Sequence, residues 1–530
     1  MSRRTKIAMA LGLAGLYLAA VNDHWAVTQD SGLYLAMGRS LAEGRGMEFS
    51  GKQVWALPPV VPFLIAGCYL LAGEHYWLSN LVMTLFGLGV VGMTYLTVRE
   101  LAADVPDTAD CPSEEGSGEG RALRSGLVAA VVVLVGLSAR LFVDSTQILT
   151  DVPFTFFAMV GLYGFLRGRN GHWAWYGLAA VALALATHTR LPGMVFLGGF
   201  ALAAVLDSRR EGYGRRMAAL AGATALVAGA VLAWFLLIRP HADPGTADHF
   251  ARLKVAHWWS LAFLWETGQA LMRIPSAICG SILGQKLVGL DLAMTALVLV
   301  GAWVAGRRRQ WIVVMPLVLY VGLLIARDYS SIAPRYFLPI MPLLVYCMVL
   351  ATQRVENWWR RRRAPPPRGA GPYRPWAVIG LVAVCLVVSV PKIAREIYWM
   401  RHPQFDAVYD GGKWSDFRNV SAVLRERGRP EADAVVASQP TIVHHLSGLR
   451  MAAGPPLWPP AGPRAYKSLP PREFAQAVAR GPWRFVVMPA DTPAWSEPMM
   501  RAIEESGAFR PAEVFGRLVL FERRPEARVD

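Results

Sequence analysis

The fold is decided by residues 29–47, which read QDSGLYLAMGRSLAEGRGM and follow the first apolar run of the chain. Asp30 begins an amphipathic helix there, and Tyr34 stands four residues later on the same helix face. A second aspartate, Asp151, precedes a later apolar run in STQILTDVPF. Charge beside hydrocarbon is costly and usually functional, so the pattern predicts chemistry at a membrane boundary.

The composition is typical of a multi-span membrane protein. Of the 530 residues, 54% are hydrophobic and only 17% are charged, which excludes an ordinary soluble domain of this length. The net charge of +16 comes from Arg in short loops without a nucleic-acid motif, so we expect no nucleic acid partner. The five cysteines form no CxxC pair, which argues against a metal site or a disulfide framework.

Eleven apolar runs are long enough, or nearly so, to cross a bilayer as helices. They lie near 6–21, 77–98, 122–142, 151–167, 172–188, 190–206, 217–238, 287–305, 311–326, 335–351 and 376–390. The apolar segment 57–72 begins with three prolines, which break a helix start, so we expect it to lie along the interface. The segment 1–22 is expected to remain as the first span.

The distribution of Arg predicts the topology. Basic clusters fall in 207–216, 306–310 and 352–375, whereas the alternate loops 22–76 and 239–286 are poor in Lys and Arg for their length. The positive-inside rule then places the N-terminus in the cytoplasm, with both aspartates and the C-terminal tail in the periplasm. The Ala/Arg/Gly-rich composition favours a bacterial inner membrane.

We expect two domains, a transmembrane catalytic domain over 1–390 and a soluble periplasmic α/β domain over 391–530. In the second, short β-branched runs alternate with helical stretches. The adjacent His444 and His445 suit packing better than metal binding. The aromatic loop 239–286 favours an interfacial helix, and a lid over the site is the alternative.

Further motifs follow in order: WALPPVVPFLIAGCYLLAG (55–73), ILTDVPFTFFAMVGLYGFLR (148–167), HTRLPGMVFL (188–197) and PRYFLPIMPLL (334–344). Together with residues 29–47, they resemble the polyprenyl-phosphate-sugar-dependent glycosyltransferases of the GT-C fold over roughly 1–350. The pattern is most similar to protein O-mannosyltransferases and lipid A aminoarabinose transferases. The resemblance implies a helical polytopic GT-C-like protein that uses a lipid-linked sugar donor.

The resemblance assigns acidic residues first. Asp30 matches an acidic residue early in the first outer loop, where family members often carry an acidic pair. Gln29 takes the partner position here, which leaves one carboxylate and the need for a divalent metal open. Asp151 matches a second acidic residue, and Asp144 is the weaker alternative.

The resemblance also assigns a set of substrate-binding residues. Arg335 and Tyr336 match a late Arg-Tyr, and Lys52 lies near a basic residue that precedes the Pro-Pro turn. Arg335, Arg190 and Lys52 would hold the lipid phosphate, with Tyr34 beside them. Asp30 would act as the base in an inverting displacement, and Asp151 would orient the acceptor or support Asp30 electrostatically.

Purely structural roles are the alternative for these residues. Both aspartates can act as helix caps, Arg190 and Arg335 can snorkel to the interface, and His188 suits packing inside the bundle. A transporter or lipid flippase is the main alternative function, and a non-catalytic scaffold is a third. The sugar stays open, as does the acceptor, which can be protein, glycolipid or polysaccharide.

Overall fold

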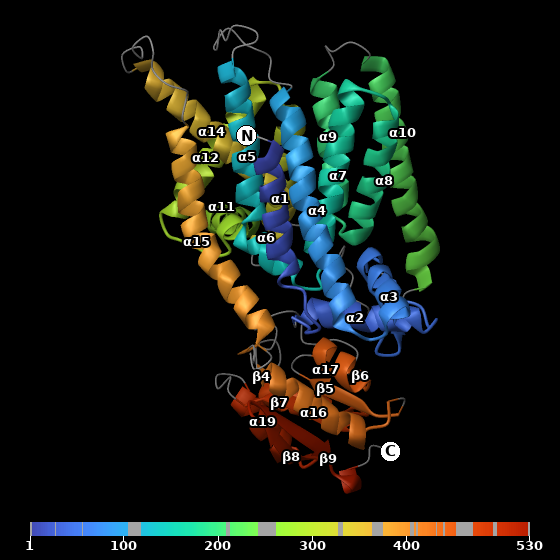
Figure 1. The fold of residues 1–530 in the computed structure, drawn as a ribbon. Coiled ribbons are helices and arrows are strands. Elements are labelled where there is room, and N and C mark those ends of the chain that lie inside the picture. The colour runs from blue at the N-terminus through green and yellow to red at the C-terminus, as the bar shows by residue number, and fades with distance from the viewer. Residues whose placement is uncertain are drawn as a thin grey trace.

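The computed structural model describes residues 3–26, 28–55, 57–103, 118–207, 213–241, 261–326, 332–362, 375–402, 408–409, 412–430, 432–437, 440–451, 470–490 and 496–527. A helical bundle forms most of the molecule, and a small sheet domain lies at one end of it (Figure 1). Residues 104–117, an acidic segment, and 242–260, part of the aromatic loop, lie outside the described residues. So does Cys111, whereas the other four cysteines are buried free thiols.

The bundle is built mostly from helices that overlap the predicted apolar runs, but residues 261–283, expected to lie in an outer loop, also form a helix. They are α1 (Arg3–Leu18), α4 (Tyr76–Ala103), α5 (Gly118–Gly136), α6 (Ala139–Ser145), α7 (Asp151–Asn170), α8 (Ala174–Thr189), α9 (Gly193–Leu206), α10 (Tyr213–Ala233), α11 (Leu261–Leu283), α12 (Leu290–Arg307), α13 (Trp311–Ala326), α14 (Met341–Arg362) and α15 (Trp376–Arg401). Short irregular helices are η1 (Trp234–Ile238), η2 (Arg239–His241) and η5 (Pro334–Ile340).

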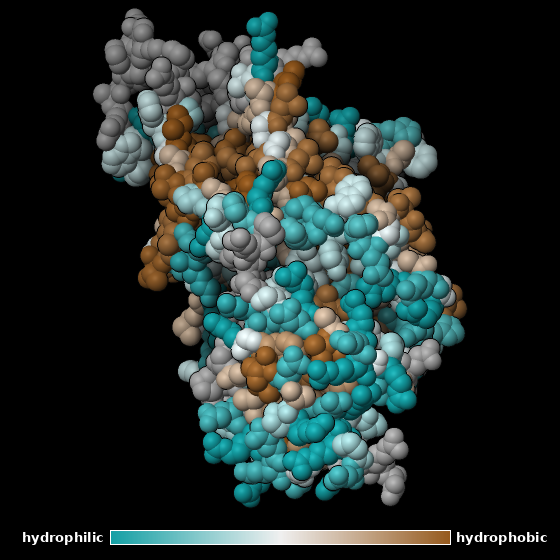
Figure 2. All heavy atoms as spheres, turned by 60° about the horizontal axis from the view of Figure 1, so that its bottom comes forward, coloured by the Kyte–Doolittle hydropathy of each residue, from teal (hydrophilic) through white to brown (hydrophobic). Residues whose placement is uncertain are grey.

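The bundle has the surface of a multi-pass membrane protein. Among the described residues, five helices are long and apolar enough to cross a bilayer, or six if α5 and α6, bent by 49°, form one span. Helices α8, α9 and α13 are shorter and also apolar. Hydrophobic side chains cover the bundle in Figure 2, whereas the sheet domain is mostly hydrophilic. The predicted helical membrane fold is confirmed, and the count of eleven spans stays a prediction.

Two helices cross the end of the bundle next to the sheet domain, α2 (Gln29–Ala42) and α3 (Val60–Ala72) (Figure 1). The hairpin of β1 (Glu48–Phe49) and β2 (Lys52–Gln53) connects them. Helix α3 begins directly after the Pro58–Pro59 pair, and it exposes Phe63, Leu70 and Leu71. An exposed apolar face at this position suits a helix that lies in the membrane interface.

The sheet domain has five strands in the order β6-β5-β7-β9-β8. The strands are β5 (Ala434–Ala437), β6 (Arg450–Met451), β7 (Phe485–Pro489), β8 (Phe509–Phe515) and β9 (Leu518–Arg523), and a short hairpin β3 (Val408–Tyr409) with β4 (Gly412–Lys413) precedes them. Parallel pairing joins β5 to β6 and β7, and antiparallel pairing joins β9 to β7 and β8. Helices α16 (Trp414–Arg427), α17 (Pro440–Ser447), α18 (Pro471–Arg480) and α19 (Ser496–Glu505) complete the domain. A small α/β domain is therefore present, as the sequence predicts.

Strand β8 (FRPAEVF) lacks the continuous apolar run that marks β5, β7 and β9 in the sequence. Its ladder with β9 shifts register between Pro511 and Glu513. Such a bulge interrupts the alternation of apolar and polar side chains that marks a strand in the sequence.

The sheet domain docks on α2 and on the β1–β2 hairpin through α17. Gly32 of α2 lies against the chain at Thr441, since a Cβ on Gly32 would stand 2.9 Å from the Thr441 carbonyl oxygen. Ser50 Oγ accepts from the Met451 amide at 2.5 Å, and Trp25 packs edge-on against the His445 ring with centroids 5.0 Å apart. The domain is therefore held against the extramembrane end of the bundle.

The two histidines of α17 are packing residues, as the sequence favours. The Ser50 amide donates to His444 Nε2 at 3.3 Å, and His444 Nδ1 donates to the Leu449 carbonyl at 2.7 Å. This arrangement requires a neutral ring, because a proton on Nε2 would face the Ser50 N–H. Burial lowers the pKa of His444 to about 4, and it lowers the pKa of His445 well below its usual value.

Acidification is therefore expected to weaken the docking of the sheet domain. A histidine whose folded pKa is depressed contributes stability above its unfolded pKa, near 6.5, and loses it as pH falls through the folded value. For His444 the loss reaches roughly 1.4 kcal/mol per pH unit within the window from about 6.5 to about 4. Protection factors from amide hydrogen exchange in α2 and α17, which correct for the slower intrinsic exchange at lower pH, should fall between pH 7 and pH 5 in the parent.

The His444→Gln variant should lose part of this pH dependence, because the lowered pKa of His445 contributes the rest. His172→Gln, at an exposed histidine between α7 and α8, should keep all of it. Equal protection factors at pH 7 and pH 5 in the parent would contradict the neutral ring assigned to His444.

Candidate active site

Asp30 is held at the start of α2 without serving as its cap. Thr28 caps the helix: its hydroxyl accepts from the Ser31 amide at 3.0 Å, and the Ser31 hydroxyl accepts from the Thr28 amide at 2.9 Å. The Asp30 carboxylate instead pairs with Arg335, with Nη1 to Oδ2 at 3.1 Å. The cap interpretation of Asp30 is thus wrong, because Thr28 and Ser31 already satisfy the first amides.

Asp151 forms the second carboxylate–guanidinium pair. It is the first residue of α7, and Arg190, in the turn between α8 and α9, donates from Nη1 to its Oδ1. The turn is tight because Gly193 presses against α8; a Cβ there would lie 2.5 Å from the Thr187 amide nitrogen. The HTRLPG motif therefore folds Arg190 back toward the start of α7.

Tyr336 joins the two pairs. Arg335 stands over its ring at 5.1 Å from the centroid, and Arg190 stands over it at 5.4 Å. Arg335 Nη2 also donates to the Tyr336 hydroxyl at 3.2 Å. Both residues belong to η5, whose prolines at 334 and 339 interrupt regular helix before α14 begins. The break lets two consecutive side chains, Arg335 and Tyr336, meet groups from other helices.

Tyr34 lies close enough to Asp30 and Asp151 for both carboxylates to act on it electrostatically. Burial raises the pKa of Tyr34, the Asp30 carboxylate raises it further, and a hydrogen bond with Thr150 opposes both. Asp151 and Arg190 also influence this phenol electrostatically. Asp30, Tyr34, Asp151, Arg190, Arg335 and Tyr336, which we call the outer cluster, thus meet at one end of the bundle.

The two carboxylates of the outer cluster differ in access to water. The Asp30 side chain is 46% exposed and that of Arg335 is 31% exposed. The Asp151 side chain is only 3% exposed and that of Arg190 is 17% exposed. Asp30 can therefore meet a molecule from outside, whereas Asp151 is suited to balancing the charge of Arg190.

Lys52 lies outside this cluster. It belongs to β2, and among the described residues no hydrogen bond or ion pair joins its ammonium group to the other six. His188 likewise behaves as a packing residue: Nδ1 donates to the Ala184 carbonyl at 2.9 Å and the ring packs on Trp234. The phosphate-holding role of Lys52 stays a prediction.

A buried ion pair lies beside the outer cluster. Asp144 of α6 is fully buried, and its Oδ2 accepts from Arg140 Nε at 2.8 Å. Arg140 Nη2 lies 2.8 Å from Asp144 Oδ1 without forming a hydrogen bond to it. The ion pair spans one turn of α6, a spacing of four residues that the sequence displays. Asp144, the weaker alternative for the second acidic residue, is paired with Arg140 here, whereas Asp151 is itself a member of the outer cluster.

The outer cluster does not resemble a metal site. Among the described residues, no group of three or more His, Cys, Asp or Glu side chains is close enough to hold an ion. Both carboxylates are paired with guanidinium groups, so the site has cations where a divalent metal would need further anionic ligands. We therefore derive no chemical step through a metal.

A family model and several solved structures match this chain. The family model of dolichyl-phosphate-mannose-protein mannosyltransferases matches residues 120–210, which contain Asp151 and Arg190. A structure of ArnT from Cupriavidus metallidurans bound to undecaprenyl phosphate matches with a TM-score of 0.63 at 14% identity, covering 99% of each chain. The chain has a GT-C fold. The apo ArnT structure matches equally well, with a TM-score of 0.63 at 15% identity and 99% of each chain covered.

A second solved structure with this fold is more distant. It is the Archaeoglobus fulgidus oligosaccharyltransferase, tethered to an acceptor peptide containing the NVT sequon. It matches with a TM-score of 0.53 at 12% identity, covering 95% of this chain and 72% of the other. No curated protein sequence matches the chain. The predicted similarity to O-mannosyltransferases and lipid A aminoarabinose transferases is confirmed at the level of the fold.

The two carboxylates should differ in their effect on stability. Asp151→Asn leaves Arg190 charged and largely buried, which we expect to cost about 3–5 kcal/mol. Asp30→Asn breaks a pair that is partly exposed, which we expect to cost less than about 1 kcal/mol. Thermal unfolding of both variants in one detergent measures the contrast.

The double variant Asp151→Asn with Arg190→Gln provides the control, because it removes the unpaired charge. It should be more stable than Asp151→Asn alone. Equal losses of stability for Asp30→Asn and Asp151→Asn would mean that burial of the Asp151–Arg190 pair does not affect stability.

Proposed function

We propose that this protein is a membrane glycosyltransferase that transfers a sugar from a polyprenyl-phosphate donor to an acceptor at the periplasmic face. The observation that carries the proposal is the outer cluster, in which Tyr336 joins an exposed Asp30–Arg335 pair to a buried Asp151–Arg190 pair. The outer cluster lies at the end of a GT-C bundle, where a lipid with its tail in the bilayer would present its phosphate.

The two arginines supply the charge that the donor requires. A sugar phosphate on a lipid carries a negative phosphate whose charge grows as the bond to the sugar C1 breaks. Guanidinium groups hold phosphate oxygens through short, paired hydrogen bonds. Because Arg335 is more exposed than Arg190, the phosphate would reach Arg335 first and displace the Asp30 carboxylate from it.

Displacement by the phosphate would free Asp30 to act as a base. A hydroxyl or amine of the acceptor attacks C1, the bond from C1 to the phosphate oxygen breaks, and the acceptor proton passes to Asp30. Arg335 and Arg190 stabilise the charge that develops on the leaving polyprenyl phosphate. Attack opposite the leaving group inverts the anomeric centre. Asp151 stays paired with Arg190 and fixes its position.

The place of the sheet domain supports a role close to the acceptor. The domain docks on α2, the helix that carries Asp30, through Gly32 and Thr441. A molecule that binds at Asp30 therefore lies close to the boundary between this domain and the bundle. The orientation follows from the Arg-rich loops, which place the opposite end of the bundle in the cytoplasm.

Sugar transfer by the purified protein in lipid nanodiscs tests the proposal. Radiolabelled polyprenyl-phosphate hexoses and pentoses would be supplied with a membrane extract as the source of acceptor, and the release of polyprenyl phosphate would be measured. At least one donor should be consumed. Asp30→Asn should reduce the rate by about 10²-fold or more while the protein remains folded.

Arg354→Gln, at an arginine near the far end of α14, serves as a matched control and should keep the parent rate. A folded parent that releases no polyprenyl phosphate from any donor would contradict the proposal and favour a transporter or a flippase. Full activity of Asp30→Asn would remove the base from the mechanism.

A further inference from the structure

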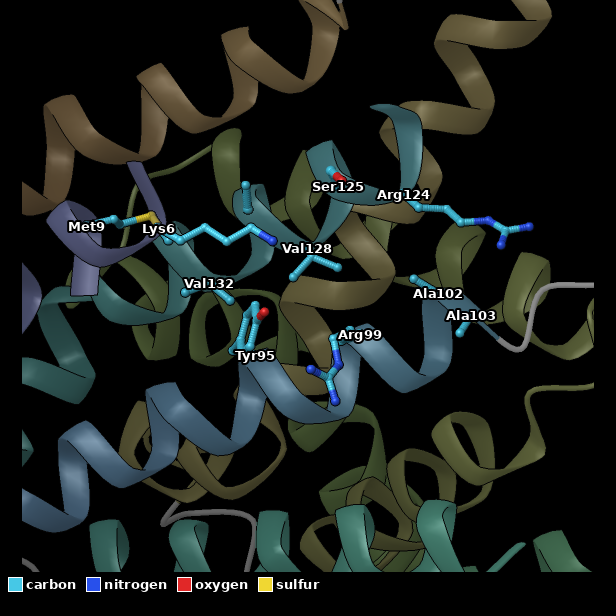
Figure 3. Close-up of a pocket in the computed structure, with 11 residues that line it drawn as sticks. Lys6, Met9, Tyr95, Arg99, Ala102, Ala103, Arg124, Ser125, Val128 and Val132 are labelled. Carbon is cyan, nitrogen blue, oxygen red and sulfur yellow. The ribbon is translucent and has the colours of Figure 1, made fainter. Parts of the chain in front are cut away.

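A second cationic site lies at the other end of the bundle. A cavity of about 230 Å³ opens between α1, α4 and α5, and Figure 3 shows the residues that line it. Helix α4 begins at Tyr76, beside the sheet domain, and Arg99 lies roughly 35 Å further along it at 1.5 Å per residue. The cavity is therefore separate from the outer cluster.

Three different helices contribute cations to this cavity, namely Lys6 from α1, Arg99 from α4 and Arg124 from α5. In Figure 3 the side chain of Lys6 extends from α1 toward Val128, and Tyr95 and Arg99 stand one turn apart on α4. The nearby carboxylate of Glu100 is shared, because it lies 3.4 Å from both Arg99 and Arg167. Glu100 therefore neutralises only part of the charge of Arg99.

The rest of the lining is apolar. Met9 of α1 and Val128 and Val132 of α5 lie on one side, and Ala102 of α4 closes the other. Next to the cavity, Ile7 and Leu11 of α1 are exposed apolar side chains. A single water needs only ~10–15 Å³ of such space, so the cavity admits a group much larger than water. Cationic side chains beside an apolar lining suit an amphiphile with an anionic headgroup.

We propose that this cavity binds the phosphate headgroup of an anionic membrane lipid, with an acyl chain along the exposed side of α1. Lys6 and Arg99 hold the phosphate, and the Tyr95 hydroxyl is placed to donate to one of its oxygens. The same end of the bundle carries Arg307 and Arg362, both exposed, so an anionic leaflet is attracted to this face. The proposal does not depend on the transferase mechanism.

Native mass spectrometry of the purified full-length chain tests the proposal. Phosphatidylglycerol and phosphatidylcholine with identical acyl chains are added in turn, and the lipid-bound fraction is measured. The parent should retain phosphatidylglycerol preferentially. Lys6→Gln with Arg99→Gln should weaken that binding by about tenfold to thirtyfold, since each cation near a membrane surface favours an anionic lipid.

Two further variants separate a built site from diffuse attraction. Arg307→Gln with Arg362→Gln removes the same charge from the same face and should leave binding within about twofold of the parent. Val128→Phe fills the cavity, keeps every charge and should weaken binding as strongly as the Lys6 and Arg99 substitutions. Equal losses in both double-charge variants, or full binding by Val128→Phe, would overturn the proposal.

Competition identifies the source of the phosphate. Glycerol phosphate at millimolar concentration should leave most of the phosphatidylglycerol bound, because it lacks the acyl chain that contacts apolar side chains. Displacement of the lipid by glycerol phosphate at equal concentration would assign the site to a soluble phosphate ester and overturn the lipid proposal.

Discussion

The outer cluster depends on charge neutralisation between two arginines and two aspartates at the edge of an apolar bundle. An unpaired charge there would be costly, so each guanidinium group must have a carboxylate or a phosphate beside it. In the structure both arginines are paired, Arg335 with Asp30 and Arg190 with Asp151. A phosphate can therefore bind Arg335 only by replacing Asp30 as its partner. Donor binding and the release of Asp30 are linked in this way.

The pairs also explain why four separate segments meet. Helix α2, the start of α7, the turn after α8 and η5 each bring one or two charged or aromatic groups to the same point. The sheet domain adds a second constraint, because it holds α2 from the outside through Gly32, Ser50 and the ring of His445. Asp30 is thus fixed from the membrane side and from the water side.

Much of this arrangement follows from local patterns in the sequence. Apolar runs locate the helices, Pro58 and Pro59 locate the start of α3, and the alternation of loops brings Asp30, Asp151, Arg190 and Arg335 to one face. The pairing of each arginine with its aspartate could not be predicted, because Asp30 and Arg335 are 305 residues apart and no local rule relates them. The docking of His444 and His445 on α2 is also a long-range contact, and the adjacent histidines gave no sign of their partners.

The central claim is that a lipid phosphate competes with Asp30 for Arg335. The most direct measurement is the dissociation constant of undecaprenyl phosphate for the parent, Asp30→Asn and Arg335→Gln in nanodiscs. The account predicts opposite signs: Asp30→Asn should bind more tightly than the parent because the competing carboxylate is gone, and Arg335→Gln should bind more weakly. Weaker binding by Asp30→Asn, or an unchanged affinity in Arg335→Gln, would contradict it.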